Sequence, residues 1–392
     1  MRRSGFGLGK IFGINVRIDW SWLLIFALTS WNLASAAQAL HPNWSDGLSW
    51  VLAIVGASLF FGSVLAHELA HSLIARAQGT QVDNITLFLF GGVSNIQEEP
   101  SSPQKEFVMA ILGPVTSLII GGVLITLVNL FAGPLGALAA PPQALVARLG
   151  PLSTLALWLG TVNIALGIFN LIPGFPLDGG RVVRSILWGL TDNLRQATQW
   201  ASWLGQVIAW VMILAGIASA FGARVPLVGR GLVSGLWLAF IGWFLSNAAT
   251  QSYRRVVIED ILDDVSISRM MRENPPTVPS NISLESFVHD YVMRTDDYGF
   301  PVVDGEELRG IITLDDVRAV PRQDWATKSV GEVMTPRERL ITADPEECAS
   351  EALDKLTRHD IRQLPVVQEG RLVGLVRRRD IVRWLRLHSE LS

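Results

Sequence analysis

The stretch Val64-Leu65-Ala66-His67-Glu68-Leu69-Ala70-His71 places three ionisable side chains inside a long apolar run, Leu48–Ala75. Ionisable groups inside an apolar span cost free energy unless they are paired, so they indicate a functional site. Residues four positions apart lie on one face of a helix, which brings His67 and His71 together. The run therefore predicts an apolar helix that carries a polar site in its last third.

Two imidazoles at this spacing can bind one metal ion. Glu68 points about 100° away from His67 by helix geometry, so it flanks the metal instead of joining the ligand pair. From there it can act as a general base and take a proton from a metal-bound water. The alternative is a pair of polar residues near a helix end. The metal site is favoured because the residues lie in an apolar span.

A catalytic zinc usually has three protein ligands and one open position. The best candidate for the third ligand is Asp178, in the segment Asn170-Leu-Ile-Pro-Gly-Phe-Pro-Leu-Asp-Gly-Gly-Arg181. Two prolines and three glycines in this segment end the preceding apolar run and force an irregular backbone. A carboxylate there needs a partner, which is either zinc or an arginine. The alternative for Asp178 is a helix cap before Gly179 and Gly180.

Composition divides the 392-residue chain into an apolar part and a charged part. Apolar residues make up 49% of the chain and charged residues only 17%, whereas soluble proteins carry about 25% charged residues. Charges are sparse before Tyr253 and dense from Ile258 onward. We therefore predict a polytopic α-helical membrane domain at residues 1–255 and a soluble α/β domain at residues 256–392.

Six apolar runs are long enough to cross a membrane, which takes about 20 residues. They are Trp20–Ala39, Leu48–Ala75, Phe107–Phe131, Leu152–Leu171, Gln199–Phe221 and Gly231–Ala249. The first run follows no cleavage signal, so we interpret it as a retained span.

Basic residues set the predicted orientation, because they gather on the cytoplasmic side. With the N-terminus inside, eleven basic residues flank the inner ends and three the outer ends. The inner set is Arg2, Arg3, Lys10, Arg17, Arg76, Lys105, Arg181, Arg184, Arg195, Arg254 and Arg255, and the outer set is Arg148, Arg224 and Arg230. We expect a multi-pass protein of the cell membrane with both termini cytoplasmic. His67, His71 and Asp178 then lie at similar depth, toward the cytosol.

Between the second and third spans, Val82–Gln97 has the composition of a strand, with a glycine pair at Gly91 and Gly92 that indicates a bend. Non-helical backbone at membrane depth must be paired within the protein or line a cavity. We expect a small β-sheet or re-entrant hairpin next to the second span.

The soluble part contains an internal repeat. Phe300-Pro-Val-Val-Asp304 returns as Leu364-Pro-Val-Val-Gln368, and the pairs Pro301/Pro365, Gly310/Gly374 and Asp316/Asp380 all differ by 64 positions. Each copy has a helix pattern, Ser283–Met293 or Cys348–His359, then two short strands and a second helix. We place the copies at about 266–322 and 329–388.

His-Glu-x-x-His and Asn-x-x-Pro-x-x-Pro-Leu-Asp-Gly on two separate spans resemble the site-2 protease family of intramembrane zinc metalloproteases. Gly91-Gly92 and Gly113-Pro114 add to the resemblance, which covers roughly residues 10–250. It implies one zinc ion held by His67, His71 and Asp178, with Glu68 as general base and Asn170 holding the scissile carbonyl. The alternative for Asn170 is a polar residue that bridges two helices, although a neutral donor near the metal suits an oxyanion.

This family cleaves transmembrane segments of other proteins, so the resemblance implies single-span membrane proteins as substrates and regulated intramembrane proteolysis. A helix hides its peptide bonds and must first be unwound. The hypothesis that follows is that an extended substrate pairs with the edge of the Thr86–Phe90 strand.

The C-terminal repeat is similar to a tandem pair of CBS domains, which often bind ATP, ADP or AMP between the copies. By that resemblance Thr313 contacts phosphate and Asp316 contacts ribose. The second copy has Arg377 in place of the hydroxyl and retains Asp380, and an arginine can also pair with phosphate. The alternative is a pair that serves as a platform for a homodimer.

Two other functions remain open. A metal or ion transporter regulated by CBS domains would use the same histidines and aspartate, although it needs no general base at Glu68. A membrane scaffold would bind partner helices without cutting them. The sequence has no basic stripe with interleaved aromatic residues, which argues against nucleic acid, and the net charge of −3 is uninformative on this point. The single cysteine, Cys348, excludes an intrachain disulfide.

Overall fold

The computed structural model describes residues 5–89, 91–96, 100–132, 147–225, 231–295, 297–305 and 307–389. It divides into two compact units, Met1–Arg254 and Arg255–Ser392. Several residues named above lie outside the described set: Arg2, Arg3, Phe90, Gln97, Arg230 and the side chain of Arg255.

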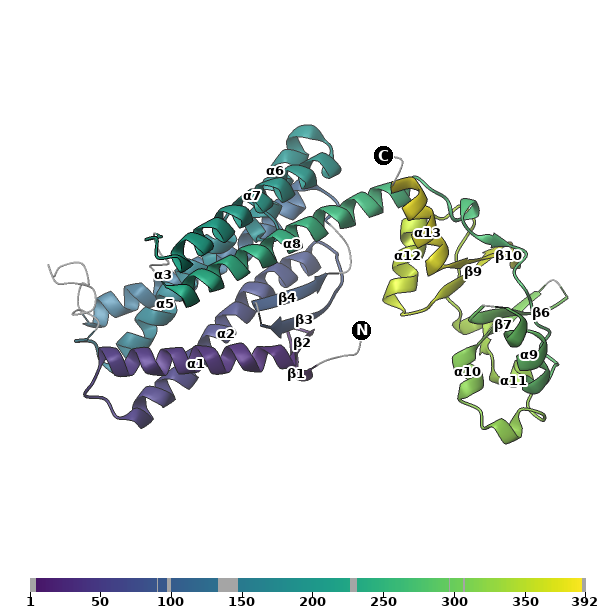
Figure 1. Ribbon diagram of the computed structural model, residues 1–392, viewed down its shortest axis with the longest axis horizontal. Helices are drawn as coiled ribbons and strands as arrows, with labels where there is room; N and C mark the ends of the chain where they lie inside the picture. The colour runs from purple at the N-terminus through teal and green to yellow at the C-terminus, as the bar shows by residue number, and fades with distance from the viewer. Residues whose placement is uncertain are drawn as a thin grey trace. The chain divides into compact units, whose positions relative to one another are not determined.

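Among the described residues, six helices of the first unit are long and apolar enough to cross a membrane (Figure 1). They are α1 (Trp20–Leu40), α2 (Asp46–Ala77), α3 (Pro103–Ala132), α5 (Pro151–Asn170), α7 (Leu194–Ala220) and α8 (Leu232–Asp263). All six predicted spans are confirmed as helices. Helix α8 runs 14 residues past the predicted end at Ala249, because its polar second half continues the helix into the C-terminal unit.

Polar side chains cap the spans at their N-termini, where backbone N–H groups have no partner in the helix. Ser45 Oγ accepts a hydrogen bond from Leu48 N at 3.2 Å before α2. Asp19 does the same for Ser21 N before α1, and Asn193 for Gln196 N before α7. A short helix that the sequence analysis did not predict, α6 (Asp178–Thr191), follows α5.

Helices α3 and α5 approach closely through small residues, as membrane helices do where packing stabilises their association. A side chain at Gly121 would lie 2.7 Å from the carbonyl oxygen of Gly160, and one at Gly167 would lie 3.0 Å from that of Pro114. This contact fixes the C-terminal end of α5, and with it the segment that leads to Asp178.

The expected small sheet is present beside α2 (Figure 1). Its four strands follow the order β1-β2-β3-β4: β1 (Phe6–Ile11), β2 (Ile14–Ile18), β3 (Val82–Phe88) and β4 (Gly91–Ile96). Strand β2 pairs parallel with β3, and β3 pairs antiparallel with β4. The β1–β2 hairpin was not predicted, although Ile14-Asn-Val-Arg-Ile18 alternates apolar and polar residues as a half-buried strand does.

The hypothesis that Thr86–Phe90 offers a free strand edge is wrong for its described residues. Thr86 faces Arg17 of β2 on one side and Val93 of β4 on the other, so both edges of β3 are already hydrogen-bonded. Among the described strands, the outer strand on this side is β4. An extended chain could therefore add only at β4 or at β1.

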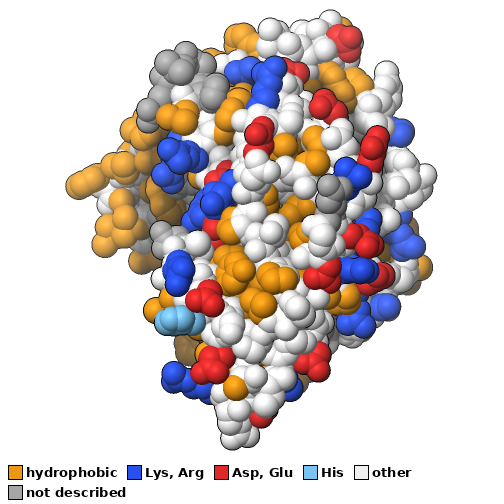
Figure 2. Space-filling model, turned by 90° about the vertical axis from the view of Figure 1, so that its right-hand side faces the viewer, with side chains coloured by type: hydrophobic (Ala, Val, Ile, Leu, Met, Phe, Trp, Pro, Cys, Tyr) orange, Lys and Arg blue, Asp and Glu red, His pale blue; other side chains and the backbone are white. Residues whose placement is uncertain are grey.

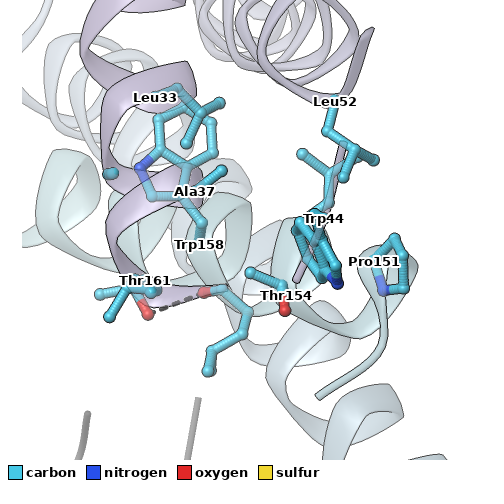
Figure 3. Close-up of a pocket in the computed structure, with 12 residues that line it drawn as sticks. Leu33, Ala37, Trp44, Leu52, Pro151, Thr154, Trp158 and Thr161 are labelled. Carbon is cyan, nitrogen blue, oxygen red and sulfur yellow. Dashed lines mark hydrogen bonds between the residues drawn. The ribbon is translucent and has the colours of Figure 1, made fainter. Parts of the chain in front are cut away.

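An apolar pocket of about 250 Å³ lies between α1, α2 and α5 (Figure 3). The hydroxyls of its two threonines are already bonded, Thr161 Oγ1 to Leu157 O at 2.8 Å and Thr154 Oγ1 to His41 Nε2 at 3.2 Å. Leu52, which lines the pocket, precedes His67 by 15 residues, or about 22 Å along the helix. The pocket is therefore separate from the polar site on α2.

The C-terminal unit confirms the internal repeat. Strands β6 (Gly299–Asp304) and β9 (Gln363–Gln368) begin 64 residues apart, as do β7 (Glu307–Thr313) and β10 (Arg371–Arg377). The α-helices are α9 (Leu284–Asp290), α10 (Leu314–Arg318), α11 (Val330–Val333), α12 (Ala349–Arg358) and α13 (Arg378–Ser389), and the remaining strands are β5 (Arg272–Glu273) and β8 (Thr335–Pro336). Strand β5, which leads into the first copy, pairs with β10 of the second, and β8 of the second pairs with β7 of the first.

Each copy has its own apolar core. Phe287, Phe300 and Ile312 are fully buried in the first, and Leu356, Leu364 and Val376 in the second.

Basic and acidic side chains are interspersed over the face of the molecule that Figure 2 shows. Such mixed charge is typical of a soluble surface.

Candidate metal centre

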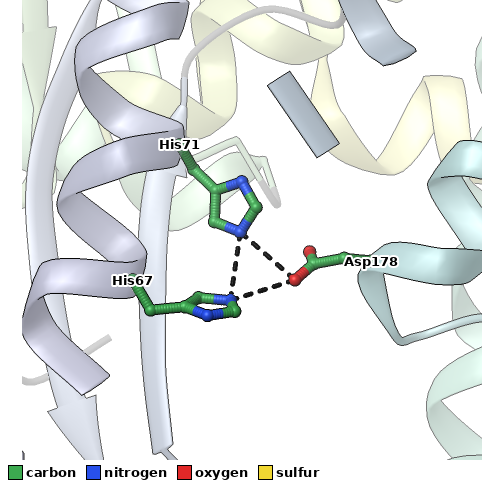
Figure 4. A group of neighbouring side chains, drawn as sticks. All are labelled: His67, His71 and Asp178. Carbon is green, nitrogen blue, oxygen red and sulfur yellow. Dashed lines mark hydrogen bonds and ion pairs between the residues drawn. The ribbon is translucent and has the colours of Figure 1, made fainter. Parts of the chain in front are cut away.

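Two histidines of α2 and one aspartate of α6 converge on a single point (Figure 4). His67 Nε2 lies 3.0 Å and His71 Nε2 lies 3.2 Å from Asp178 Oδ2, and the two nitrogens are 3.2 Å apart. Both imidazoles are buried and the side chain of Asp178 is 16% exposed. The structure thus brings Asp178 to two histidines that precede it by more than a hundred positions.

The spacing of these atoms fits a zinc ion. Ligands at 2.0–2.1 Å in a tetrahedron lie about 3.3 Å from one another, and the three observed separations are 3.0–3.2 Å. Two nitrogen lone pairs and a carboxylate oxygen repel one another unless a metal ion or a shared proton lies between them. The donor set therefore suits a divalent metal, with one coordination position left over for water or substrate.

The second nitrogen of each imidazole is held by α3. His71 Nδ1 lies 2.7 Å from the carbonyl oxygen of Met109, which can only accept, so Nδ1 carries the proton and Nε2 is free to bind metal. His67 Nδ1 lies 2.9 Å from the buried Ser117 hydroxyl. These contacts orient both rings, and nothing in the local sequence of α2 indicated them.

Gly113 of α3 leaves the space that the two rings occupy. A methyl group at this position would overlap His71 Nε2 and would lie 2.7 Å from His67 Nε2. Glycine is therefore required where α3 crosses the site, at a cost in helix propensity of about 1 kcal/mol.

Asp178 is the first residue of α6, and tight packing fixes that helix start. Phe175 N donates to Ala201 O of α7 at 3.2 Å, and a side chain at Gly205 would overlap the carbonyl oxygen of Phe175. A side chain at Gly180 would likewise overlap the backbone at Gly174. Asp178 does not cap the helix through its own side chain, since Oδ2 faces the two histidines.

A buried ion pair joins α6 to α3. Arg184 Nε donates to Glu106 Oε1 at 2.7 Å, and the two side chains are 4% and 0% exposed. Arg184 also lies over the ring of Phe175, with 5.3 Å between its Cζ and the ring centroid. Because a buried ion pair tolerates little displacement, it fixes the rotation of α6 and so the direction of Asp178.

Glu68 is half-buried and faces β4. Its Oε2 accepts a hydrogen bond from Ser94 Oγ at 2.8 Å. Asn170, the last residue of α5, donates from Nδ2 to Leu166 O at 3.0 Å, a bond within its own helix. That bond uses one of the two Nδ2 hydrogens.

Four residues were predicted to bind a nucleotide, two in each CBS copy, and their hydrogen bonds differ between the copies. Thr313 and Asp316 form a capping box at the start of α10: Thr313 N and Oγ1 donate to Asp316 Oδ2 at 2.8 and 2.7 Å. At the matching place in the second copy, Arg377 makes two hydrogen bonds to Asp380, at 2.7 and 3.0 Å. These bonds raise the pKa of Arg377 above its ordinary value.

A buried carboxylate that the sequence analysis missed, Asp297, completes this ion-pair cluster. It is 5% exposed and accepts hydrogen bonds from Arg377 at 2.7 Å, Arg272 at 2.8 Å and Arg379 at 3.3 Å. Asp297 belongs to the first copy and Arg377 to the second, so the ion pairs join the two. No motif marks Asp297, because its partners follow 80 residues later or lie 25 residues before it.

The chain is similar to known zinc metalloproteases and to CBS domains. The model of "Peptidase family M50" matches residues 55–144 and 128–214, and that of "CBS domain" matches residues 264–322 and 330–387. "Putative zinc metalloprotease Rip3" of Mycobacterium tuberculosis is 35% identical over 97% of this chain and 93% of its own length. "Putative zinc metalloprotease sll0528" of Synechocystis is 33% identical over 96% and 94%. The site-2 protease structure from Methanocaldococcus jannaschii is 26% identical, covers 64% of this chain and 95% of its own, and has a TM-score of 0.40.

Six membrane-capable helices with a His-His-Asp group, followed by a tandem α/β repeat, are what an M50 peptidase domain joined to CBS domains requires. The chain belongs to peptidase family M50, the site-2 protease family of zinc metalloproteases. The predicted family and fold class are confirmed.

Replacing Gly113 by alanine should reduce zinc retention at least tenfold, because the added methyl group displaces both imidazoles. Zinc content per chain after dialysis, measured by atomic emission, checks this. The matched control is Gly122→Ala on the same helix, where an added methyl group meets nothing within 4 Å. Equal zinc content in the two variants would contradict the assignment.

Proposed function

We propose that this chain is an intramembrane zinc endopeptidase that hydrolyses peptide bonds in the transmembrane segments of single-span proteins, as a step of regulated intramembrane proteolysis. The observation that carries the proposal is the triangle of His67, His71 and Asp178 atoms, with Glu68 adjacent on the same helix. Membership of the M50 family supports it.

In this proposal the protein's own residues have separate tasks. Zinc supplies a Lewis acid that polarises the scissile carbonyl and activates water when it is bound. His67, His71 and Asp178 hold it, and their contacts to α3 and α7 keep them in place before the substrate arrives. Glu68 takes a proton from the attacking water and delivers it to the leaving nitrogen. Asn170 donates its second Nδ2 hydrogen to the scissile carbonyl oxygen.

The main alternative is a CBS-regulated transporter that carries a metal ion through the same site. Two observations favour hydrolysis. Glu68 has a carboxylate next to the ligands that the coordination set does not need, and β4 places a strand beside it. A transported ion also requires ligands that release it, whereas these imidazoles are held by bonds on their far side.

The variant Glu68→Gln should cut substrates about 10²- to 10⁴-fold more slowly than wild type while it retains zinc, because it loses only the proton acceptor. The assay uses the purified full chain in proteoliposomes with a panel of single-span segments, analysed by mass spectrometry. Chelation should abolish cleavage by wild type, and added zinc should restore it.

If wild type cuts no segment that Glu68→Gln spares, the proposed function is overturned. Zinc uptake into the same vesicles, lost in His67→Ala and unchanged in Glu68→Gln, would establish the transporter instead. Binding of segments without cleavage or uptake would indicate the scaffold.

We also propose that the protein crosses the cell membrane six times with both termini in the cytoplasm, with domains at residues 1–255 and 256–392 and CBS copies at about 266–322 and 329–388. The six apolar helices and the excess of basic residues at one set of their ends support this orientation.

Cys348, the single cysteine, reports this orientation directly because it is partly exposed in the C-terminal unit. A maleimide that cannot cross membranes should leave Cys348 unlabelled in intact cells and label it after permeabilisation. A cysteine introduced at Arg148, in a predicted outer loop, is the control and should label in intact cells. Labelling of Cys348 in intact cells would show that the C-terminal unit lies outside the cell and would contradict the proposed orientation.

For the CBS pair we propose binding of an adenine nucleotide by Thr313 and Asp316, with the pair also forming a homodimer. Both side chains are half-exposed at the start of α10, so the Thr313 hydroxyl and the Asp316 carboxylate can meet a ligand. Arg377 and Asp380 of the second copy can take part only after their ion pairs open.

Calorimetry of the full chain in detergent with ATP, ADP and AMP should show binding that Asp316→Asn weakens at least tenfold and Asp380→Asn leaves within twofold. The expected difference arises because Asp380 is already paired with Arg377. The opposite pattern would place the nucleotide at the second copy. No heat with any nucleotide, together with a dimer mass by light scattering, would leave only the dimerisation platform.

A further inference from the structure

A hydrogen-bonded chain of two serines ends on Glu68. Ser94 Oγ donates to Glu68 Oε2 at 2.8 Å, and Ser72 Oγ donates to Ser94 Oγ at 3.1 Å. Ser72 follows Glu68 by one helical turn and is fully buried, so its hydroxyl has a fixed place. The carboxylate of Glu68 is thus held by one oxygen, which leaves Oε1 for other chemistry.

Residues of strand β4 contact the side chain of Glu68 along its length. Successive side chains of a strand point to opposite faces, and Val93 and Asn95 are exposed while Ser94 between them faces α2. Gly92, two residues earlier on the same face, lies so near that a methyl group there would overlap Glu68 Cγ. Gly92 and Ser94 therefore contact the stem and the head of one side chain.

Glutamate has three rotatable side-chain bonds, and an unrestrained carboxylate samples many positions. The rate of hydrolysis depends on how accurately the general base is positioned before the substrate binds. A displacement of about 1 Å can lower the rate about 100-fold. A hydrogen bond to a charged acceptor is among the stronger ones in proteins. The bond from Ser94 is therefore suited to hold Glu68 in one position.

We propose that Ser94 is a positioning residue for hydrolysis: it acts through Glu68 and fixes the carboxylate of the general base. The proposal rests on the proposed protease function. Since β4 is the outer strand on this side of the sheet, a substrate strand that pairs with it also steadies Ser94, and substrate docking and alignment of the base are then one event.

The variant Ser94→Ala should lower kcat about 10- to 100-fold, the factor expected for one lost bond to a charged group. KM should stay within about twofold. Ser94→Thr, which keeps the hydroxyl and whose branched side chain suits a strand, should restore most of kcat. The matched control is Ser58→Ala on α2, whose exposed hydroxyl donates to Ile54 O within its own helix, and it should leave both constants unchanged.

A second readout separates positioning from mere structural support. In the Glu68→Gln background, the further change Ser94→Ala should lower the residual rate by less than about twofold, because the serine acts through the carboxylate. Zinc content and melting temperature of Ser94→Ala should match wild type. A loss of zinc or of folding in Ser94→Ala that Ser94→Thr does not repair would overturn the proposal.

The two hypotheses fail in different ways. If wild type cuts none of the segments, the protease function is overturned and the role of Ser94 falls with it. If wild type cuts and Ser94→Ala retains its kcat within twofold, only the proposal for Ser94 is overturned.

Discussion

The membrane unit depends on one electrostatic constraint: a carboxylate and two imidazoles must meet in apolar surroundings. Moving Asp178 alone into such surroundings costs several kcal/mol, and convergence on His67 and His71 compensates that cost only if all three atoms meet within about an ångström. The ligand separations of 3.0–3.2 Å satisfy this condition. The packing of α3, α5, α6 and α7 around the site keeps the three side chains within this distance of one another.

The helices meet that demand through two kinds of contact. Glycines allow close approach, at Gly113 beneath the imidazoles and at Gly180 and Gly205 around the segment before Asp178. The buried pair of Glu106 and Arg184 then sets the rotation of α6. Glycine packing alone is tolerant of rotation, whereas an ion pair has one good geometry, so the two contacts complement each other.

Much of the fold could be predicted because its signals are local. Six apolar runs specified six helices, and a 64-residue repeat specified two similar α/β copies. The grouping of His67, His71 and Asp178 was also accessible, since two short motifs marked these residues. Contacts between distant segments could not be predicted. The contact of Ser94 with Glu68 and the ion pairs of Asp297 join distant segments, and no local pattern marks them. The β1–β2 hairpin and helix α6 were missed although each carries a local pattern, an alternating strand and an amphipathic helix.

The two CBS copies show how one backbone plan supports different chemistry. Strands β6 and β7 begin and end 64 residues before β9 and β10, yet the first copy has the hydroxyl of Thr313 where the second has the guanidinium of Arg377. A hydroxyl at a helix start can exchange its bond to Asp316 for one to a ligand at little cost. Arg377 is bonded to two carboxylates, those of Asp380 and Asp297. If Asp297 lost its contacts with the three arginines, its own buried negative charge would have no compensating partner. The sequence difference at one position thus makes the second copy a rigid contact between the repeats, while the first retains a half-exposed polar surface.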